Sequence, residues 1–171
     1  MQLTIQQKVF SLREAFAIMD GEGNKLYEVK GRILSIGHKL TVSDLDENPV
    51  MHIYQKVLSL VPKYFLEPEG GEEVELKGHI TLLKPHYTLE LPGGDWEIRG
   101  DFTAHEYEIT CGDRLVAAVH QQWFSWGDCY ELTVNDDADA MLALGVMLAI
   151  DCVDADTRRG AADTTARAAQ N

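Results

Sequence analysis

The sequence predicts a mainly β protein: a closed, twelve-stranded antiparallel barrel that encloses a C-terminal hydrophobic α-helix. Three observations lead to this prediction. A similar phrase recurs along the chain, the copies alternate apolar and polar residues as half-buried hairpins do, and one long apolar segment follows the last copy. Six hairpins supply twelve strands, and closing the sheet removes both of its exposed edges.

The repeat is clearest in its first three copies. The phrases QQKVFSL, KGRILSI and YQKVLSL contain Ser11, Ser35 and Ser59, which stand 24 residues apart and serve as markers of the repeat. The register continues more weakly through HITLLKPHY and DFTAHEYEI and then through WFSWGDCY. An apolar residue stands two positions before each marker: Val9, Ile33, Val57, Ile80, Phe102 and Trp123. Because a fixed period indicates repeated structural units, we expect six similar hairpins.

The strands and turns follow from this register. Apolar and polar residues alternate over 74–80, 96–102 and 130–134, as in antiparallel strands with one buried face. Polar turns, DGEGN, DLDENP, PEGGEE, PGGD and CGDR, separate the units. A second reversal follows each marker. If the strands run up and down in order, the marker turns gather at one end of the barrel and the acidic turns at the other.

The segment DDADAMLALGVMLAIDCVDAD predicts a helix over about 137–153. Its acidic start suits a helix N-terminus, and its apolar residues lie on every side, as in a fully buried helix. A twelve-stranded barrel is wider than one that side chains alone can fill. The helix, about 25 Å long, matches a seven-residue strand of about 23 Å. We therefore expect one domain over 1–155 with the helix at its centre, and a small, polar, disordered tail over 156–171.

Several glycines fall on the apolar, inward phase of the predicted strands. Gly31, Gly78 and Gly100 would let the central helix approach the barrel wall, with Gly145 of the helix as the matching small residue. Strand bulges are the alternative explanation of these glycines.

Composition excludes some functions. Asp and Glu number 28 against 15 Lys and Arg, and the net charge of −13 argues against nucleic acid and against non-specific attraction to anionic membranes. Cys111, Cys129 and Cys152 form no CxxC pair, which suggests free thiols in a reducing compartment. No signal peptide is apparent, and the longest apolar run, 140–150, is too short for a transmembrane span. We expect a soluble, cytoplasmic protein.

The ordered series QKVFSL, YQKVLSLVPKY, GDFTAHEYEI and WFSWGDCYEL resembles the LURP-one-related family of the tubby C-terminal-like superfamily, over residues 1 to about 155. The resemblance implies the barrel fold, and it supplies no catalytic residue and no cofactor. The superfamily also includes tubby, which binds phosphoinositides, and the phospholipid scramblases. A phosphoinositide site is thus one alternative, with Lys30 and Arg32 as the phosphate-binding pair. Their acidic neighbours favour a solvated surface instead.

An enzyme is a second alternative. His105 and Glu106 are similar in part to the zinc-protease motif, but position 109 is isoleucine and the predicted context is a strand, so we expect no metal site. The sequence contains no nucleophile elbow and no phosphate-binding glycine loop. A hydrolase or transferase would have to use an unrecognised group of His105, Glu106 and Asp101.

The leading hypothesis is a non-enzymatic binding or scaffold module that docks to a protein partner or a membrane interface through an apolar rim. The marker turns would supply that rim at one end of the barrel. Alternatively, these residues fold inward and close the barrel floor over the helix. The rim residues are Leu12, Ile36, Leu60, Leu83, Trp126, Phe10 and Phe124.

Overall fold

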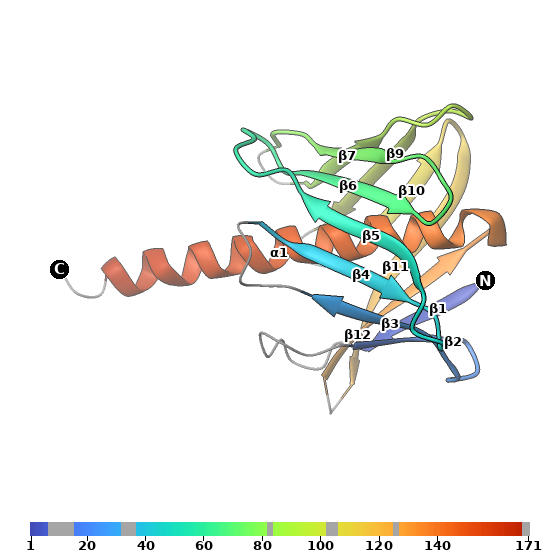
Figure 1. Ribbon diagram of the computed structural model, residues 1–171. Coiled ribbons are helices and arrows are strands. Elements are labelled where there is room, and N and C mark those ends of the chain that lie inside the picture. The colour runs from blue at the N-terminus through green and yellow to red at the C-terminus, as the bar shows by residue number, and fades with distance from the viewer. Residues whose placement is uncertain (7–15, 32–36, 82–83, 102–105, 125–126, 169–171) are drawn as a thin grey trace.

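The computed structural model is a closed twelve-stranded barrel with one long helix through its centre (Figure 1). It describes residues 1–6, 16–31, 37–81, 84–101, 106–124 and 127–168. The strands are β1 (Gln2–Gln6), β2 (Phe16–Asp20), β3 (Lys25–Gly31), β4 (Lys39–Ser43), β5 (Pro49–Gln55), β6 (Lys63–Pro68), β7 (Val74–Gly78), β8 (His86–Leu89), β9 (Trp96–Asp101), β10 (Glu106–Cys111), β11 (Arg114–Phe124) and β12 (Gly127–Val134).

Each strand pairs in antiparallel fashion with its neighbours in sequence, and β1 pairs with β12 to close the barrel. The closing register places Leu3 opposite Leu132. Closure leaves no edge strand open to pairing with another chain. The predicted fold class is therefore confirmed.

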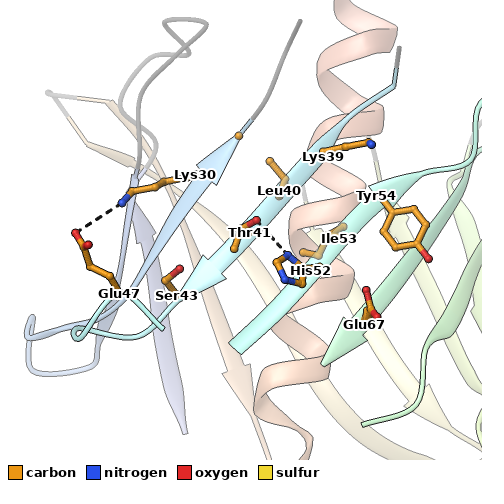
Figure 2. A pocket seen from close by; sticks show the side chains of 11 residues that line it. Lys30, Lys39, Leu40, Thr41, Ser43, Glu47, His52, Ile53, Tyr54 and Glu67 are labelled. Atoms are coloured by element: carbon orange, nitrogen blue, oxygen red, sulfur yellow. Dashed lines mark hydrogen bonds and ion pairs between the residues drawn. The ribbon is translucent and has the colours of Figure 1, made fainter. Parts of the chain in front are cut away.

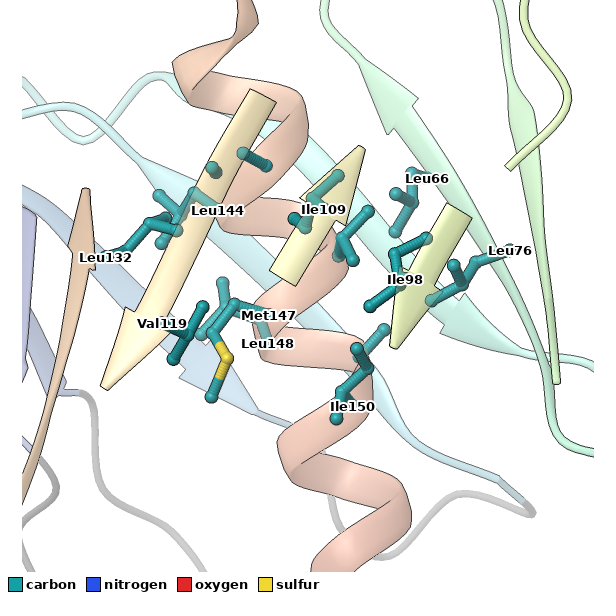
Figure 3. Close-up of a cluster of buried hydrophobic side chains, with 14 of the residues drawn as sticks. Leu66, Leu76, Ile98, Ile109, Val119, Leu132, Leu144, Met147, Leu148 and Ile150 are labelled. Carbon is teal, nitrogen blue, oxygen red and sulfur yellow. The ribbon is translucent and has the colours of Figure 1, made fainter. Parts of the chain in front are cut away.

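The barrel wall alternates as the sequence predicts. Leu66, Leu76, Ile98 and Ile109 come from β6, β7, β9 and β10, are at most 1% exposed, and point inward to one hydrophobic cluster (Figure 3). Burying such side chains stabilises a fold by about 1.5–3 kcal/mol each. The residues that alternate with them along each strand point to the outer face of the barrel. This alternation explains why apolar residues recur at every second position of the sequence.

The centre of the barrel is filled by helix α1 (Ala140–Ala168), which follows a short 3-10 turn η1 (Asp137–Asp139). The side chain of Asp136 accepts a hydrogen bond from the backbone N–H of Ala138, so the acidic residues begin the helix as expected. Residues 143–150 are all buried, and the helix contacts strands on opposite sides of the barrel. The predicted central helix is confirmed.

The helix is longer than predicted. It continues to Ala168, not to about 153, and the disorder predicted from 156 is wrong for residues 156–168, which are helical. At 1.5 Å per residue it is about 43 Å long, so its C-terminal half projects from the barrel (Figure 1). Propagating a helix that the barrel has already nucleated is easy, and alanine and arginine, which are frequent in this segment, have high helix propensity.

The wall glycines have a different role from the predicted one. A Cβ on Gly31, Gly78 or Gly100 would meet a neighbour within the wall, Leu40, Pro62 or Tyr107, and not the helix. The tightest case is Gly100, where the Cβ would lie 2.3 Å from the ring of Tyr107. These glycines make room for large residues of the next strand or loop.

The helix glycine behaves as predicted. A Cβ on Gly145 would lie 2.5 Å from the Sδ atom of Met51 on β5, so the helix does approach the wall closely there.

Candidate docking site at the barrel mouth

The two ends of the barrel differ in chemistry. All connections from an odd-numbered strand to the next even-numbered one leave from one end, which we call the mouth. Because β12 finishes at the opposite end, α1 enters there, crosses the barrel and leaves through the mouth (Figure 1). The opposite end carries the acidic turns, and we call it the acidic end. The described marker turn, which contains Ser59 between β5 and β6, is thus at the end from which the helix projects.

The described loops of the mouth expose large apolar side chains. Leu58 and Leu60 in the β5–β6 loop are 101% exposed, Ile80 after β7 is 86% exposed, and Val57 is also exposed. The two loops are neighbours, because β6 pairs with β7 and the backbone N–H of Gly78 donates to the carbonyl of Pro62 at 2.7 Å. We call Val57, Leu58, Leu60 and Ile80 the apolar tips.

Leu58 is held in an unfavourable backbone conformation. Its φ is +64°, in the left-handed region that Gly and Asn tolerate better than leucine. A leucine that is both fully exposed and strained contributes nothing to folding. It is the kind of residue found at functional surfaces.

A groove lies between the β5–β6 loop and the emerging helix. Its volume is about 470 Å³. The loop contributes residues 55–62 to its lining, and the helix contributes Val153, Asp156 and Thr157. The helix is anchored beside it, because the carboxylate of Asp156 lies 2.9 Å from Nε2 of His38.

Exposed lysines lie at the mouth, in its loops and at the ends of its strands. Lys39, Lys56, Lys77 and Lys84 are exposed at the mouth, and in the described part of the chain no carboxylate lies within ion-pair distance of them. We call these four the mouth lysines. The Nζ of Lys56 also lies 5.7 Å from the centre of the Phe65 ring.

The acidic end has the opposite character. Its two described cationic side chains are both paired: Lys25 with Glu28 at 2.6 Å and Arg114 with Asp139 at 2.9 Å. These pairs raise the pKa of Arg114 and lower that of Glu28. The described turns of this end carry Asp20, Glu22, Asp44, Asp46, Glu47, Glu69, Glu72, Glu73, Asp95 and Asp113.

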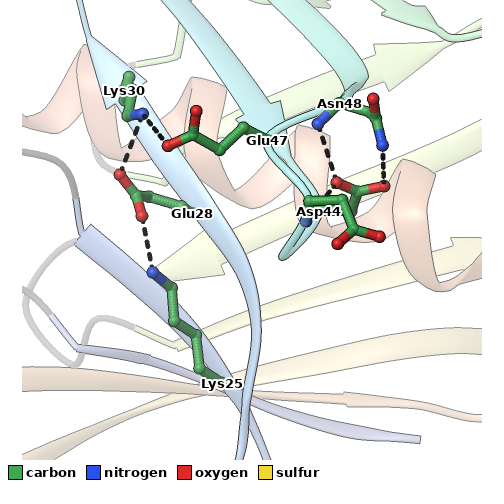
Figure 4. Close-up of polar contacts among 7 residues, drawn as sticks. Lys25, Glu28, Lys30, Asp44, Glu47 and Asn48 are labelled. Atoms are coloured by element: carbon green, nitrogen blue, oxygen red, sulfur yellow. Dashed lines mark hydrogen bonds and ion pairs between the residues drawn. The ribbon is translucent and has the colours of Figure 1, made fainter.

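Two of these acidic turns have the same internal structure. In each, an aspartate accepts hydrogen bonds from the backbone and side chain of an asparagine four residues later: Asp20 with Asn24, and Asp44 with Asn48. Figure 4 shows the Asp44 turn. These bonds lower the pKa of both aspartates. The carboxylates stabilise their own turns.

A polar cluster lies just inside the mouth. The buried hydroxyl of Tyr107 donates to the carboxylate of Asp154 on α1 at 2.8 Å. Tyr64 and Tyr87 are buried nearby, and burial raises the pKa of all three phenols. Burial likewise raises the pKa of the Cys152 thiol, which makes it a poor nucleophile. The cluster fixes the helix within the barrel.

The alternative phosphate pair lies on the outer wall. Lys30 lines an open groove of about 770 Å³ across β3–β6, together with Lys39, His52 and Glu67 (Figure 2). Its Nζ lies 3.3 Å from Glu28 and 4.0 Å from Glu47, so two carboxylates already compensate its charge (Figure 4). Arg32 lies outside the described residues. These ion pairs weigh against a phosphate site at Lys30.

The alternative catalytic group is only partly described. Glu106 stands opposite Asp101 in the β9–β10 ladder, and its carboxylate is 3.6 Å from Nδ1 of His120 on the outer surface. His105 lies outside the described residues. Among the residues that the structure describes, no three His, Cys, Asp or Glu side chains are grouped so that they could hold a metal ion.

The predicted rim is described only in part. Leu60 is fully exposed, so at this position the rim does not fold inward over the helix. Leu12, Ile36, Leu83, Trp126 and Phe10 lie outside the described residues, and for Phe124 only the backbone is described.

Sequence reasoning missed Leu58 and the mouth lysines. The lysines are scattered along the chain. Their grouping at the mouth becomes visible only when each lysine is assigned to one end of the strand or loop that carries it.

Comparison with known proteins fits this geometry. The profile of the LURP-one-related family matches residues 1–151, which span all twelve strands and the buried part of the helix. The chain belongs to the LURP-one-related family. It is 32% identical over 152 residues to the uncharacterized protein YxjI of Bacillus subtilis, covering 89% of this chain and 93% of that protein. It is 23% identical to protein LURP-one-related 10 of Arabidopsis thaliana, covering 71% of each chain.

No solved structure gives a significant match. Within the described residues, no helix is long and apolar enough to cross a membrane.

Proposed function

We propose that this protein is a non-enzymatic binding module that docks onto a protein partner or a membrane interface through the mouth of its barrel. The observation that carries the proposal is the full exposure of Leu58 and Leu60 beside Ile80. Exposing several large apolar side chains in neighbouring loops is unfavourable in water, and such patches mark interaction sites.

The rest of the structure supports a docking role. The apolar part of the helix packs against the barrel wall in one hydrophobic cluster, so the described interior is a packed core. The groove between the β5–β6 loop and the helix gives the surface a defined shape. The thiols of Cys111 and Cys152 are free, which supports a cytoplasmic location.

The test replaces the apolar tips and follows association in extracts of the cells that make the protein. We expect Leu58→Asn/Leu60→Asn/Ile80→Asn to lose membrane or partner association, measured by fractionation and cross-linking. Asparagine suits the φ of Leu58, so this substitution should raise the Tm slightly and not unfold the barrel.

Leu45→Asn is the matched control. Leu45 is 63% exposed in a turn of the acidic end, so its replacement removes an exposed leucine from the other end of the barrel. This control should keep every association. A tip variant that retains all associations of the wild type would refute docking through the mouth.

A further inference from the structure

We infer that the docking partner of the mouth is the surface of an anionic phospholipid bilayer, with the apolar tips inserted between headgroups and the mouth lysines over the phosphates. This inference rests on the proposed docking function. It names the tips of the mouth loops, whereas Lys30 lies on the outer wall in a groove that it shares with Lys39.

The first argument is the order of residues around the tips. The β5–β6 loop reads Lys56-Val-Leu-Ser-Leu-Val-Pro-Lys63, so lysines bracket its apolar tip. Ile80 is bracketed in the same way by Lys77 and Lys84. Apolar side chains beside cations match a bilayer interface, where acyl chains lie below a layer of negative headgroups.

The second argument is that the cations are available. Four mouth lysines have no carboxylate within ion-pair distance among the described residues, whereas Lys25 and Arg114 at the acidic end are both paired. A membrane-facing lysine gains by meeting an anionic headgroup only if its charge is not already compensated. Lys63, which follows the β5–β6 loop, is paired with Glu75 at 2.6 Å, so the uncompensated charge at the mouth comes from Lys39, Lys56, Lys77 and Lys84.

The net charge of −13 does not prevent this contact. The carboxylates of the acidic turns are one strand length away, about 20 Å for six residues. That distance is about twice the Debye length of about 10 Å at 0.1 M salt, so a bilayer at the mouth is largely screened from them. The bilayer therefore interacts mainly with the local charge of the mouth and not with the total.

The projecting helix sets the orientation. It passes beyond the mouth, so a flat bilayer meets the β5–β6 and β7–β8 loops obliquely (Figure 1).

The experiment measures binding of the full chain to vesicles by flotation at 0.1 M salt. One set of vesicles is phosphatidylcholine alone and another contains phosphatidylserine as well. We expect binding only with phosphatidylserine. The variant Leu58→Asn/Leu60→Asn/Ile80→Asn should bind at least about 100-fold more weakly, because each buried apolar side chain contributes about tenfold or more. Leu45→Asn should bind as the wild type does.

A matched pair of charge variants tests the lysines. Lys56→Gln/Lys84→Gln removes two positive charges at the mouth, and we expect binding about 30-fold weaker, since each lysine near the surface contributes about fivefold. Lys25→Gln/Arg114→Gln removes the same net charge at the acidic end and should leave binding unchanged. Equal losses in both variants, or no dependence on phosphatidylserine, would overturn the inference.

The outcomes separate the two proposals. If vesicle binding is absent but the tip variant loses a cross-linked protein partner in cells, the docking function stands and the lipid inference is wrong. If the tip variant loses nothing in either assay, both are wrong. A third set of vesicles contains a phosphoinositide: binding that requires Lys30 and Arg32 but not the tips would assign lipid to the outer wall and overturn the inference.

Discussion

The two ends of this barrel are built from the same topology and yet are chemical opposites. Both are sets of hairpin turns, but the acidic turns satisfy their own charges, as the Asp20–Asn24 and Asp44–Asn48 bonds illustrate. Among the residues that the structure describes, the mouth has fully exposed leucines, four lysines with no carboxylate within ion-pair distance, and Leu58 in a strained conformation. One end is optimised for folding, and the other keeps features that folding alone does not explain.

The largest change in stability is expected from adding a methyl group to a glycine near the mouth, where the packing is tighter than at the acidic end. Gly100→Ala places a Cβ 2.3 Å from the ring of Tyr107, so the ring has to move away from its position beside the helix. We expect the free energy of unfolding to fall by about 3 kcal/mol, as for an overpacked core, in urea denaturation.

The matched change at the acidic end is Gly93→Ala. A Cβ there meets nothing within 4 Å, and stability should stay the same or rise slightly because the unfolded chain loses freedom. A drop of equal size in both variants would show that the tight packing is not specific to the mouth.

The second-largest change in stability is expected in the polar cluster inside the mouth. Tyr107→Phe removes the hydroxyl that donates to the buried carboxylate of Asp154, and we expect a loss of about 2 kcal/mol in the free energy of unfolding. Tyr64→Phe is the control, because the buried hydroxyl of Tyr64 has no hydrogen-bond partner within the described residues. Removing it should be neutral or stabilising. The reverse ranking of the two variants would contradict this account of how the helix is fixed.

The smallest expected effect is a dependence of stability on pH. Partial burial, together with His86 and Lys77, lowers the pKa of His79 beside the tip residue Ile80, against a weaker opposing effect of Glu97. The folded protein therefore resists protonation of His79 more than the unfolded chain does. Its contribution to stability is present above the unfolded pKa of about 6.5 and is lost as the pH falls below that value.

His79→Gln should flatten the curve of Tm against pH between about pH 5 and 7. An unchanged slope in this variant would mean that another group causes any acid sensitivity in that range.

Much of the fold could be predicted because its information is local. The marker repeat and the alternation of apolar and polar residues predict six hairpins. A helical segment that is apolar on every side, such as 143–150, has to be buried on every side, and a closed barrel provides this. The exposure of Leu60 could be proposed but not decided, since the same residues could have closed the barrel floor. Whether Leu58 is strained depends on one φ angle, which no sequence pattern reports.

The sequence by itself determined the strand order, the closed barrel, the central helix and the separation of acidic from apolar turns, because hydrophobic periodicity and turn chemistry act over a few neighbouring residues. Only the tertiary structure decided that Gly100 makes room for Tyr107, that Tyr107 reaches Asp154, and which lysines form ion pairs with described carboxylates. These contacts join residues on different elements, so they depend on strand register and side-chain direction. The length of the helix beyond the barrel was decided in the same way, by a buried segment that nucleates an otherwise polar tail.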